Sequence, residues 1–335
     1  MVLPVSALVC LLGLLGALVL TAIGTAGAGA ASAREPRVVP VRATTGPAAS
    51  TATGRTLGVA TAGAPSDLGE VDAMIAATGV TPDQVTFYTS WAGTPDFPAA
   101  GAARVASRGA VPEIVWEPWK PGAGVVQPAY SLARIAGGSF DAYVRRWARQ
   151  VRAYGRPVVL RLAHEANGTW YPWAVGVNGN TAAQYIAAWK RVVGLFAAER
   201  VTNVTWSWTQ NIPYPGATPL ARIYPGDAVV GRVGLDGYNF GTTQSWSTWT
   251  SFADLFGPGV AELDRISSRP VHVDETGSTE WGGDKGAWIS DAWAWLAAHR
   301  EVRGVTWFSL DKETDWRVNS SDRAWRAFAA GVGSF

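Results

Sequence analysis

Residues 158–168 of the sequence are VVLRLAHEANG, a short apolar run that passes directly into polar side chains and a glycine. A run of this kind is typical of a β-strand that is buried on both faces, as strands of a parallel sheet are. The polar residues and the glycine that follow mark the point at which the strand gives way to a loop. The stretch therefore predicts a parallel strand that presents polar groups at its carboxyl end.

The same pattern recurs along the chain, with helical patterns between the apolar runs. The predicted strands lie at residues 57–61, 84–91, 111–116, 158–163, 204–208, 232–236, 271–274 and 304–308. Helical segments, among them residues 140–154, 181–200 and 285–300, separate several of the runs. Residues 210–229 contain Pro213, Pro215 and Pro219, so we expect a loop there instead of a regular helix. Eight strands that alternate with helices predict an α/β fold, a (β/α)8 TIM barrel in a single catalytic domain.

The first 55 residues differ in composition from the rest of the chain. An almost unbroken apolar run at residues 8–23, followed by small residues, predicts a secretory signal peptide over residues 1–33. Residues 34–55 are rich in Pro, Thr, Ala and Gly and are expected to form a flexible spacer, which leaves residues 56–335 for the barrel. We therefore expect a secreted, extracellular protein. Because no Lys or Arg precedes the apolar run, an uncleaved N-terminal membrane anchor is the alternative.

Composition and charge exclude some classes of protein and favour others. The formal net charge is +2 with both signs interspersed, which gives no basic stripe and argues against a nucleic-acid partner. The only cysteine, Cys10, lies in the predicted signal peptide, so no disulfide is expected. The sequence has 18 Trp, more than core packing requires. Flat aromatic platforms suit a ligand with apolar faces, such as a sugar ring.

Two glutamates stand at the ends of predicted strands, where the active sites of barrel enzymes are built. Glu165 closes the fourth strand and Glu275 closes the seventh, and each is soon followed by a glycine. Hydrolysis of a glycosidic bond requires a proton donor for the departing oxygen and a nucleophile or base at the anomeric carbon, and two carboxyl groups can supply both. A single Glu after a strand is often only a solvated loop residue. Two such residues at the mouth of one barrel indicate a shared site.

Several segments resemble glycoside hydrolase family 26. The segment at residues 161–173, RLAHEANGTWYPW, resembles the acid/base segment of that family, and residues 273–277, VDETG, resemble its nucleophile segment. Residues 115–119 and 235–239 also match, and the resemblance extends over about residues 56–335. One departure is Ala166, where many members carry Met; it lies beside the site residues and puts no catalytic role in doubt.

The resemblance implies a retaining hydrolase with Glu165 as acid/base and Glu275 as nucleophile. Most members act on β-1,4-mannans, and some relatives cleave mixed-linkage β-glucans or β-xylans. Retention predicts that the two carboxyl groups lie about 5–5.5 Å apart. The negative charge of an ionised Glu275 at that distance is expected to raise the pKa of Glu165 and keep it protonated for donation to the leaving oxygen.

Residues around the pair are expected to support it. Strand alternation places Arg161, Ala163 and Glu165 on one face and His164 on the other. Arg161 would then point into the barrel, either to keep Glu275 ionised or to form a purely structural ion pair. The resemblance implies that His164 helps to form the sugar subsite, although a strand-end histidine is equally compatible with a core role.

Further candidates follow from the same segments. Tyr238 resembles the family tyrosine that hydrogen-bonds the nucleophile. Trp170 and Trp307 are candidates for stacking on sugar rings. Glu117 is expected either to contact a sugar hydroxyl or to cap a turn. Two further residues, Asn167 in the acid/base motif and Asp236 two positions before Tyr238, are expected to play supporting roles.

A metal or cofactor is not expected. The three histidines, His164, His272 and His299, are not spaced as ligands, and a glycine-rich phosphate loop is lacking. The sequence predicts a monomeric endo-β-1,4-mannanase acting on a polysaccharide. The open alternatives are the same mechanism on mixed-linkage β-glucan or β-xylan, a non-catalytic carbohydrate-binding barrel, and a transglycosylase.

Overall fold

Eight parallel strands form a closed barrel in the computed structural model, which describes residues 54–333 and 335. Each strand pairs with its sequence neighbours, and the last pairs with the first. The strands are β1 (Thr56–Thr61), β2 (Gln84–Ser90), β3 (Val111–Glu117), β4 (Val158–Leu162), β5 (Val204–Asn211), β6 (Arg232–Asn239), β7 (Val271–Ser278) and β8 (Val302–Ser309). The predicted TIM barrel is confirmed. The predicted signal peptide and nearly all of the predicted spacer lie outside the described residues.

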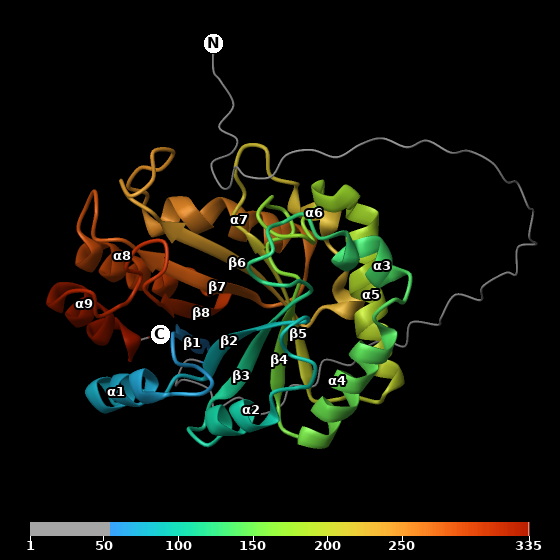
Figure 1. The fold of residues 1–335 in the computed structure, drawn as a ribbon. Helices are drawn as coiled ribbons and strands as arrows, with labels where there is room; N and C mark the ends of the chain where they lie inside the picture. Colours follow the sequence, from blue (N-terminus) through green and yellow to red (C-terminus); the bar gives the residue numbers. More distant parts are fainter. Residues whose placement is uncertain (1–53, 334) are drawn as a thin grey trace, which may run out of the picture. The chain divides into compact units, whose positions relative to one another are not determined.

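Helices surround the strands in chain order (Figure 1). They are α1 (Gly69–Thr78), α2 (Ala99–Ala106), α3 (Leu132–Ala136), α4 (Asp141–Tyr154), α5 (Ala182–Ala198), α6 (Leu220–Ile223), α7 (Phe252–Ile266), α8 (Lys285–Ala298) and α9 (Asp322–Val332). Between β5 and β6 the chain forms only the four-residue α6 and a single 3-10 turn. The prolines of this segment remove backbone donors and so interrupt any longer helix.

Local sequence signals explain where the longer helices begin and end. The side chain of Thr181 accepts from the backbone N–H of Gln184, whose own side chain accepts from the Thr181 N–H, and this capping box starts α5. Asp284 caps α8 in a similar way. Helix α4 ends at Gly155, which adopts a left-handed conformation with φ of 71°.

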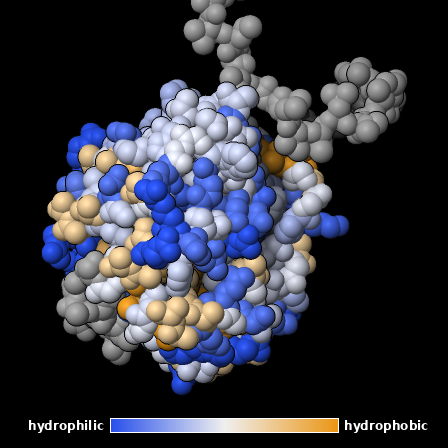
Figure 2. All heavy atoms as spheres, turned by 90° about the vertical axis from the view of Figure 1, so that its left-hand side faces the viewer, coloured by the Kyte–Doolittle hydropathy of each residue, from blue (hydrophilic) through white to orange (hydrophobic). Residues whose placement is uncertain are grey.

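The apolar core lies mainly between the barrel and its helices. Trp147 of α4, Trp189 of α5 and Trp208 of β5 are among its fully buried members. This packing accounts for many of the tryptophans. Figure 2 views the barrel from the side of α1, α8 and α9 and shows mostly hydrophilic residues, with hydrophobic ones in small groups. Across residues 54–333 and 335, the helices are all too short or too polar to span a bilayer.

Two local irregularities shape the carboxyl end of the barrel. In the pairing of β6 with β7, Leu235 faces Val273 and the next residue, Asp236, faces Glu275, so Asp274 is an extra residue in β7. Such a β-bulge turns two consecutive side chains toward the same side. After β4, Ala163 and Glu165 adopt positive φ values of 44° and 52°. Non-glycine residues rarely do so, and such strain is concentrated at functional sites.

Candidate active site

Glu275 occupies the centre of the barrel mouth and receives three hydrogen bonds. Its Oε1 accepts from Nη1 of Arg161 and from the hydroxyl of Tyr88, both at 2.6 Å. Its Oε2 accepts from the hydroxyl of Tyr238. The side chain of Glu275 is 6% exposed, so the carboxylate keeps a small open face. Three donors aimed at one carboxylate fix its orientation and suit an ionised nucleophile.

Glu165 lies at the end of β4 and is also nearly buried. The indole Nε1 of Trp170 donates to its Oε2 at 2.6 Å, and Nδ2 of Asn211 donates to its Oε1 at 3.2 Å. Burial and the charge of Glu275 raise the pKa of Glu165 to about 7, against the lowering effect of the two donors. A carboxyl group with this pKa can both give and take a proton near neutral pH, which is what an acid/base residue must do.

Arg161 lies beneath this pair and joins the carboxylates of the barrel interior. Besides Glu275, it donates to Oε1 of Glu113 from Nε at 3.1 Å and from Nη2 at 3.0 Å, and its Nη1 lies 3.4 Å from Oδ1 of Asp236. Nη2 also donates to the backbone oxygen of Asp274 at 2.9 Å. Burial alone would lower the pKa of the guanidinium, but the surrounding carboxylates raise it well above its ordinary value. Both expected roles of Arg161, contact with the nucleophile and an interior ion pair, are present in one side chain.

A second arginine forms a deeper layer that sequence reasoning missed. Arg232 donates to Oε1 of Glu113 at 2.5 Å, to Oδ1 of Asp274 at 3.1 Å and to Oε1 of Gln84 at 2.6 Å. Although burial opposes it, the charges of Arg232 and Arg161 hold the pKa of Asp274 well below its usual range. Two arginines and two strand-borne carboxylates thus form a rigid polar floor under the mouth. The sequence does carry a signal for this layer: a charged residue, such as Arg232 or Glu113, in an otherwise apolar strand indicates an ion pair inside the barrel.

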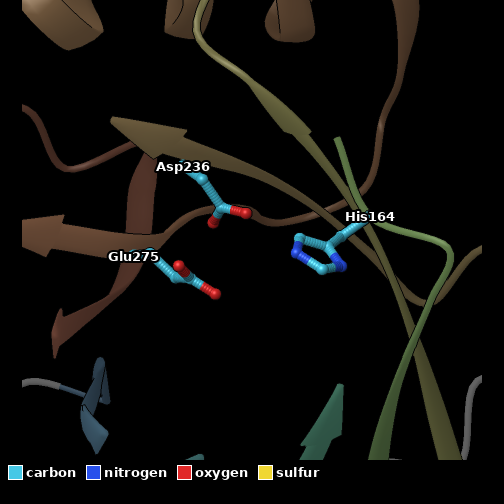
Figure 3. A group of neighbouring side chains, drawn as sticks. All are labelled: His164, Asp236 and Glu275. Atoms are coloured by element: carbon cyan, nitrogen blue, oxygen red, sulfur yellow. The ribbon is translucent and has the colours of Figure 1, made fainter. Parts of the chain in front are cut away.

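Asp236 and Glu275 lie side by side on neighbouring strands, and the ring of His164 lies opposite them (Figure 3). One nitrogen of His164 and one oxygen from each carboxylate all lie within 4.8 Å of one another. Burial, and then the charge of Arg161, hold the pKa of His164 well below its usual value, so the ring is neutral. Burial and the charge of Glu275 raise the pKa of Asp236 well above its usual value. Within the described part of the chain, Nδ1 of His164 and Oδ2 of Asp236 have no hydrogen-bond partner.

These three side chains are poorly arranged to bind a cation. Both oxygens of Glu275 already accept hydrogen bonds, and the guanidinium of Arg161 lies 2.6 Å from one of them. A metal ion would therefore meet a fixed positive charge at its own ligand. The unpartnered atoms of His164 and Asp236 are buried, so the two residues line the bottom of the site.

The strained turn after β4 changes one expectation from the sequence. Strand alternation predicted that Glu165 and His164 lie on opposite faces. In the structure β4 ends at Leu162, and both side chains lie at the mouth, because the positive φ values of Ala163 and Glu165 break the alternation. His164 contacts Tyr171, whose hydroxyl lies 3.1 Å from its Nε2.

Asn167 braces this turn against β5. Its Nδ2 donates to the backbone oxygen of Asn211 at 2.8 Å, and its Oδ1 accepts from the Asn211 N–H at 3.0 Å. Asn211 in turn donates to Glu165, so Asn167 helps to position the carboxyl group of Glu165 through its neighbour.

The aromatic candidates separate into two environments. Trp170 is 39% exposed and stacks on Tyr214 with ring centroids 6.0 Å apart, so its ring is available to a ligand. Trp307 is only 1% exposed and packs against Trp293 of α8 and Phe328 of α9. The expectation that Trp307 stacks on a sugar is wrong, because its position in β8 points outward, toward the helices.

Glu117 and Lys312 complete the charges at the mouth. Glu117 ends β3 and accepts from Nε1 of Trp119 at 3.1 Å. Burial raises the pKa of Glu117 to about 8, and the charge of Glu275 adds to the effect. Lys312, in the loop after β8, lies near enough for its charge to lower the pKa values of Glu117 and Glu165. Neither Lys312 nor Tyr88, which binds the nucleophile, was identified from the sequence.

The fold and the paired carboxyl groups define a barrel glycosidase. Residues 110–285, slightly more than half of the chain, match the model of glycosyl hydrolase family 26. The chain belongs to this family.

Two curated relatives carry different activities in their names. Endoglucanase H of Acetivibrio thermocellus is 38% identical over 257 residues, which cover 75% of this chain and 27% of that protein. Mannan endo-1,4-beta-mannosidase A and B of Caldalkalibacillus mannanilyticus is 34% identical over 90 residues, 25% of this chain and 17% of that protein. The matches thus span about a quarter or less of the length of these relatives.

Solved structures show the same fold. The Bacillus subtilis mannanase BCman superimposes with a TM-score of 0.60 over 83% of this chain and 85% of its own, at 18% sequence identity. The barrel architecture is therefore that of the solved mannanase, while the low identity leaves the substrate to be argued from the site.

Proposed function

We propose that this protein is a retaining endo-glycosidase that cleaves internal β-linked bonds of a polysaccharide by double displacement. The observation that carries the proposal is the contrast between two carboxyl groups at one mouth. Glu275 accepts three hydrogen bonds, whereas Glu165 has its pKa raised to about 7. Two carboxyl groups whose environments differ in this way take the separate roles of nucleophile and acid.

In the first step, a carboxylate oxygen of Glu275 attacks the anomeric carbon and the bond to the departing oxygen breaks. The departing oxygen takes the proton of Glu165, so the leaving group departs as a neutral alcohol. In the second step, the now ionised Glu165 takes a proton from water as the water oxygen attacks the same carbon. The ester bond to Glu275 then breaks, the sugar leaves with its original configuration, and both residues return to their starting states.

The surrounding groups hold the reacting atoms in place. Arg161, Tyr88 and Tyr238 keep Glu275 oriented, and the loss of its charge on ester formation removes one cause of the raised pKa of Glu165. That residue then gives up its proton more readily and becomes the base. His164 and Asp236, each with an atom within 4.8 Å of Glu275, are buried and form the wall of the site beside the reacting carboxylate.

For the polymer, we favour a β-glucan of mixed linkage, with β-1,4-mannan as the second candidate. The sequence resemblance pointed first to mannan. The relative that matches three quarters of this chain is named an endoglucanase, whereas the mannanase relative matches one quarter. Release of reducing ends from mixed-linkage glucan, mannan and xylan, compared at equal enzyme concentration, distinguishes the candidates.

The catalytic assignment is tested with Glu275→Ala in the presence of sodium azide. We expect hydrolysis to fall by at least about a thousandfold, and azide to restore turnover of an activated β-glycoside with formation of an α-glycosyl azide. Glu280→Ala is the matched control, because Glu280 is an exposed glutamate in the loop directly after β7. Undiminished hydrolysis by Glu275→Ala would refute the assignment. A product of inverted configuration from the unaltered enzyme would refute retention.

We also propose that the protein is exported and acts as a monomer. The apolar run at residues 8–23 supports export. N-terminal sequencing of the protein from culture medium should show cleavage near residues 28–33, and sedimentation should give the mass of one chain.

A further inference from the structure

Most of the exposed large aromatic residues that the structure describes lie in the loops that follow the strands. Among the described residues, the exposed large hydrophobic side chains are Val126 and four aromatic ones: Tyr88, Trp170, Trp246 and Trp281. Tyr88 and Trp170 hydrogen-bond the two catalytic carboxyl groups. Trp246, in the loop after β6, is 60% exposed, and Trp281, in the loop after β7, is 67% exposed. The reaction described above uses neither of these two.

A series of ring contacts connects Trp246 to the nucleophile. Tyr238, which hydrogen-bonds Glu275, packs on Trp316 with ring centroids 4.9 Å apart. Trp316 meets Phe240 edge to face at 4.8 Å, and Phe240 meets Trp246 at 5.0 Å. The packed rings thus form an unbroken series from the bottom of the site to the exposed rim, through the buried Trp316.

The two loops that carry Trp246 and Trp281 are fastened to each other. The N–H of Thr242 donates to the backbone oxygen of Trp281 at 3.2 Å. Gly241 has a φ of 51°, and a Cβ atom there would come within 1.8 Å of that same oxygen. A Cβ atom on Gly283 would come within 2.3 Å of the ring of Trp249. These close approaches need glycine and hold the loops together.

A buried asparagine closes the β6 loop from below. Oδ1 of Asn239 accepts from the N–H groups of Gly241 at 3.2 Å and Thr250 at 3.0 Å. Its Nδ2 donates to Oγ of Ser278 at 2.9 Å. The exposed indoles therefore stand on a braced support, which reduces the entropy lost when a ligand binds them.

We propose that Trp246 and Trp281 form a rim surface that binds sugar units of the same polysaccharide, beyond the units that react. This inference rests on the proposed function. The chemistry around the indoles favours a carbohydrate over a membrane or an acidic partner. Residues 242–251, TTQSWSTWTS, contain hydroxyl and amide side chains but no charged one. The indole of Trp246, with these uncharged hydrogen-bonding neighbours, matches the apolar faces and hydroxyls of a sugar chain. Trp281 adds a second exposed indole, beside the exposed Glu280.

The test compares a long substrate with a short one. For each variant, kcat/KM is measured on mixed-linkage β-glucan or β-mannan, whichever the unaltered enzyme cleaves, and on an aryl glycoside of the corresponding disaccharide. In Trp246→Ala and Trp281→Ala we expect the ratio of polymer to short-substrate kcat/KM to fall about tenfold, the cost of removing one well-placed aromatic contact. Trp246→Tyr, which keeps a ring, should restore most of the ratio. The control Val126→Ala removes an even more exposed hydrophobic side chain in a different loop and should leave the ratio unchanged.

The outcomes separate this inference from the proposed function. An unchanged ratio in both Trp→Ala variants, with hydrolysis retained, would overturn the rim surface and leave the hydrolase intact. If the unaltered protein cleaved none of the polymers, the hydrolase proposal would fail, and electrophoresis in gels containing each polymer would decide the inference. Retardation that is lost in Trp246→Ala would support the rim surface, and equal migration of all variants would overturn it.

Discussion

Arg161 and Glu275 meet at 2.6 Å inside the barrel, and the same guanidinium also contacts Glu113 and Asp236. One cation thus joins Glu275 to the polar floor that the strands build beneath it. A buried charge network of this kind is costly to assemble but fixes geometry tightly, because each partner depends on the others. The position of Glu275, the proposed nucleophile, is therefore tied to the stability of the fold.

This coupling predicts the effect of Arg161→Met. Removing the cation leaves Glu275 and Asp236 without their arginine, while Glu113 keeps one arginine, Arg232. The free energy of unfolding should therefore fall by about 3–5 kcal/mol, measured by urea denaturation at pH 7. Arg161→Lys should also destabilise the protein, because a single ammonium cannot replace the guanidinium's several donors. Arg108→Met is the control: it removes an exposed pair with Asp72, which solvent screens, and should change the free energy of unfolding far less. Equal costs at the two sites would contradict the network.

The pKa of Glu165 sets the alkaline limit of activity. In the proposed mechanism, formation of the glycosyl-enzyme requires protonated Glu165. The protonated fraction of Glu165 declines as pH rises through about 7. We therefore expect kcat/KM to fall about tenfold per pH unit above that value. With an aryl glycoside whose leaving group needs no proton, the Glu165→Gln variant should still form the glycosyl-enzyme. Its kcat/KM should no longer show this alkaline limb, the fall as pH rises above about 7. A limb that persists in Glu165→Gln would assign the titration to another group.

Trp170 should shift that limb in a defined direction. Its indole N–H donates to Glu165 at 2.6 Å, and this bond lowers the pKa of the carboxyl group by favouring the ionised form. Trp170→Phe removes the donor, so the alkaline limb should move to higher pH by about half a unit. Tyr214→Ala is the control, because it removes the ring that stacks on Trp170 but leaves the hydrogen bond. A shift of equal size in both variants would attribute the effect to altered packing.

The sequence predicts the barrel and the two glutamates because both depend on local patterns. Short apolar runs separated by helical ones specify the strands, and a Glu at the end of such a run is visible without knowledge of distant contacts. Trp307 shows the limit of the same reasoning. In a strand buried on both faces, alternation does not tell which side faces the barrel interior. The neighbouring Phe308 is the residue whose ring meets Tyr88 and Tyr238 at the mouth.

Other features of the site arise from backbone irregularities and from long-range contacts. The positive φ values of Ala163 and Glu165 involve residues that give no local signal for that conformation. The bulge at Asp274 lets two consecutive acidic residues serve the barrel, one in the floor and one as nucleophile. Tyr88 lies 187 positions before Glu275 in the chain, so their contact follows only from closure of the barrel.

Glu117 predicts how the stability of the protein depends on pH. Its pKa is raised from 4.5 to about 8 by burial, so the folded state favours the protonated form. In the unfolded chain the group ionises near its ordinary value. Between these two pH values unfolding therefore releases a proton, and the free energy of unfolding falls as pH rises through that range. Below about pH 4 both states are protonated, and Glu117 imposes no such cost.

Glu117→Gln should therefore stabilise the protein at alkaline pH and change little in acid. Glutamine keeps an oxygen that can accept from Trp119 but carries no charge to desolvate. We expect the free energy of unfolding at pH 9 to rise by about 1–3 kcal/mol relative to the unaltered protein, with a difference near zero at pH 4. Urea denaturation of both proteins at the two pH values measures this, and Glu280→Gln, at an exposed position, should match the unaltered protein at both. Destabilisation by Glu117→Gln at pH 9 would contradict this prediction. It would mean that the ionised carboxylate of Glu117 is stabilised in the folded protein, by a direct ion pair with Lys312.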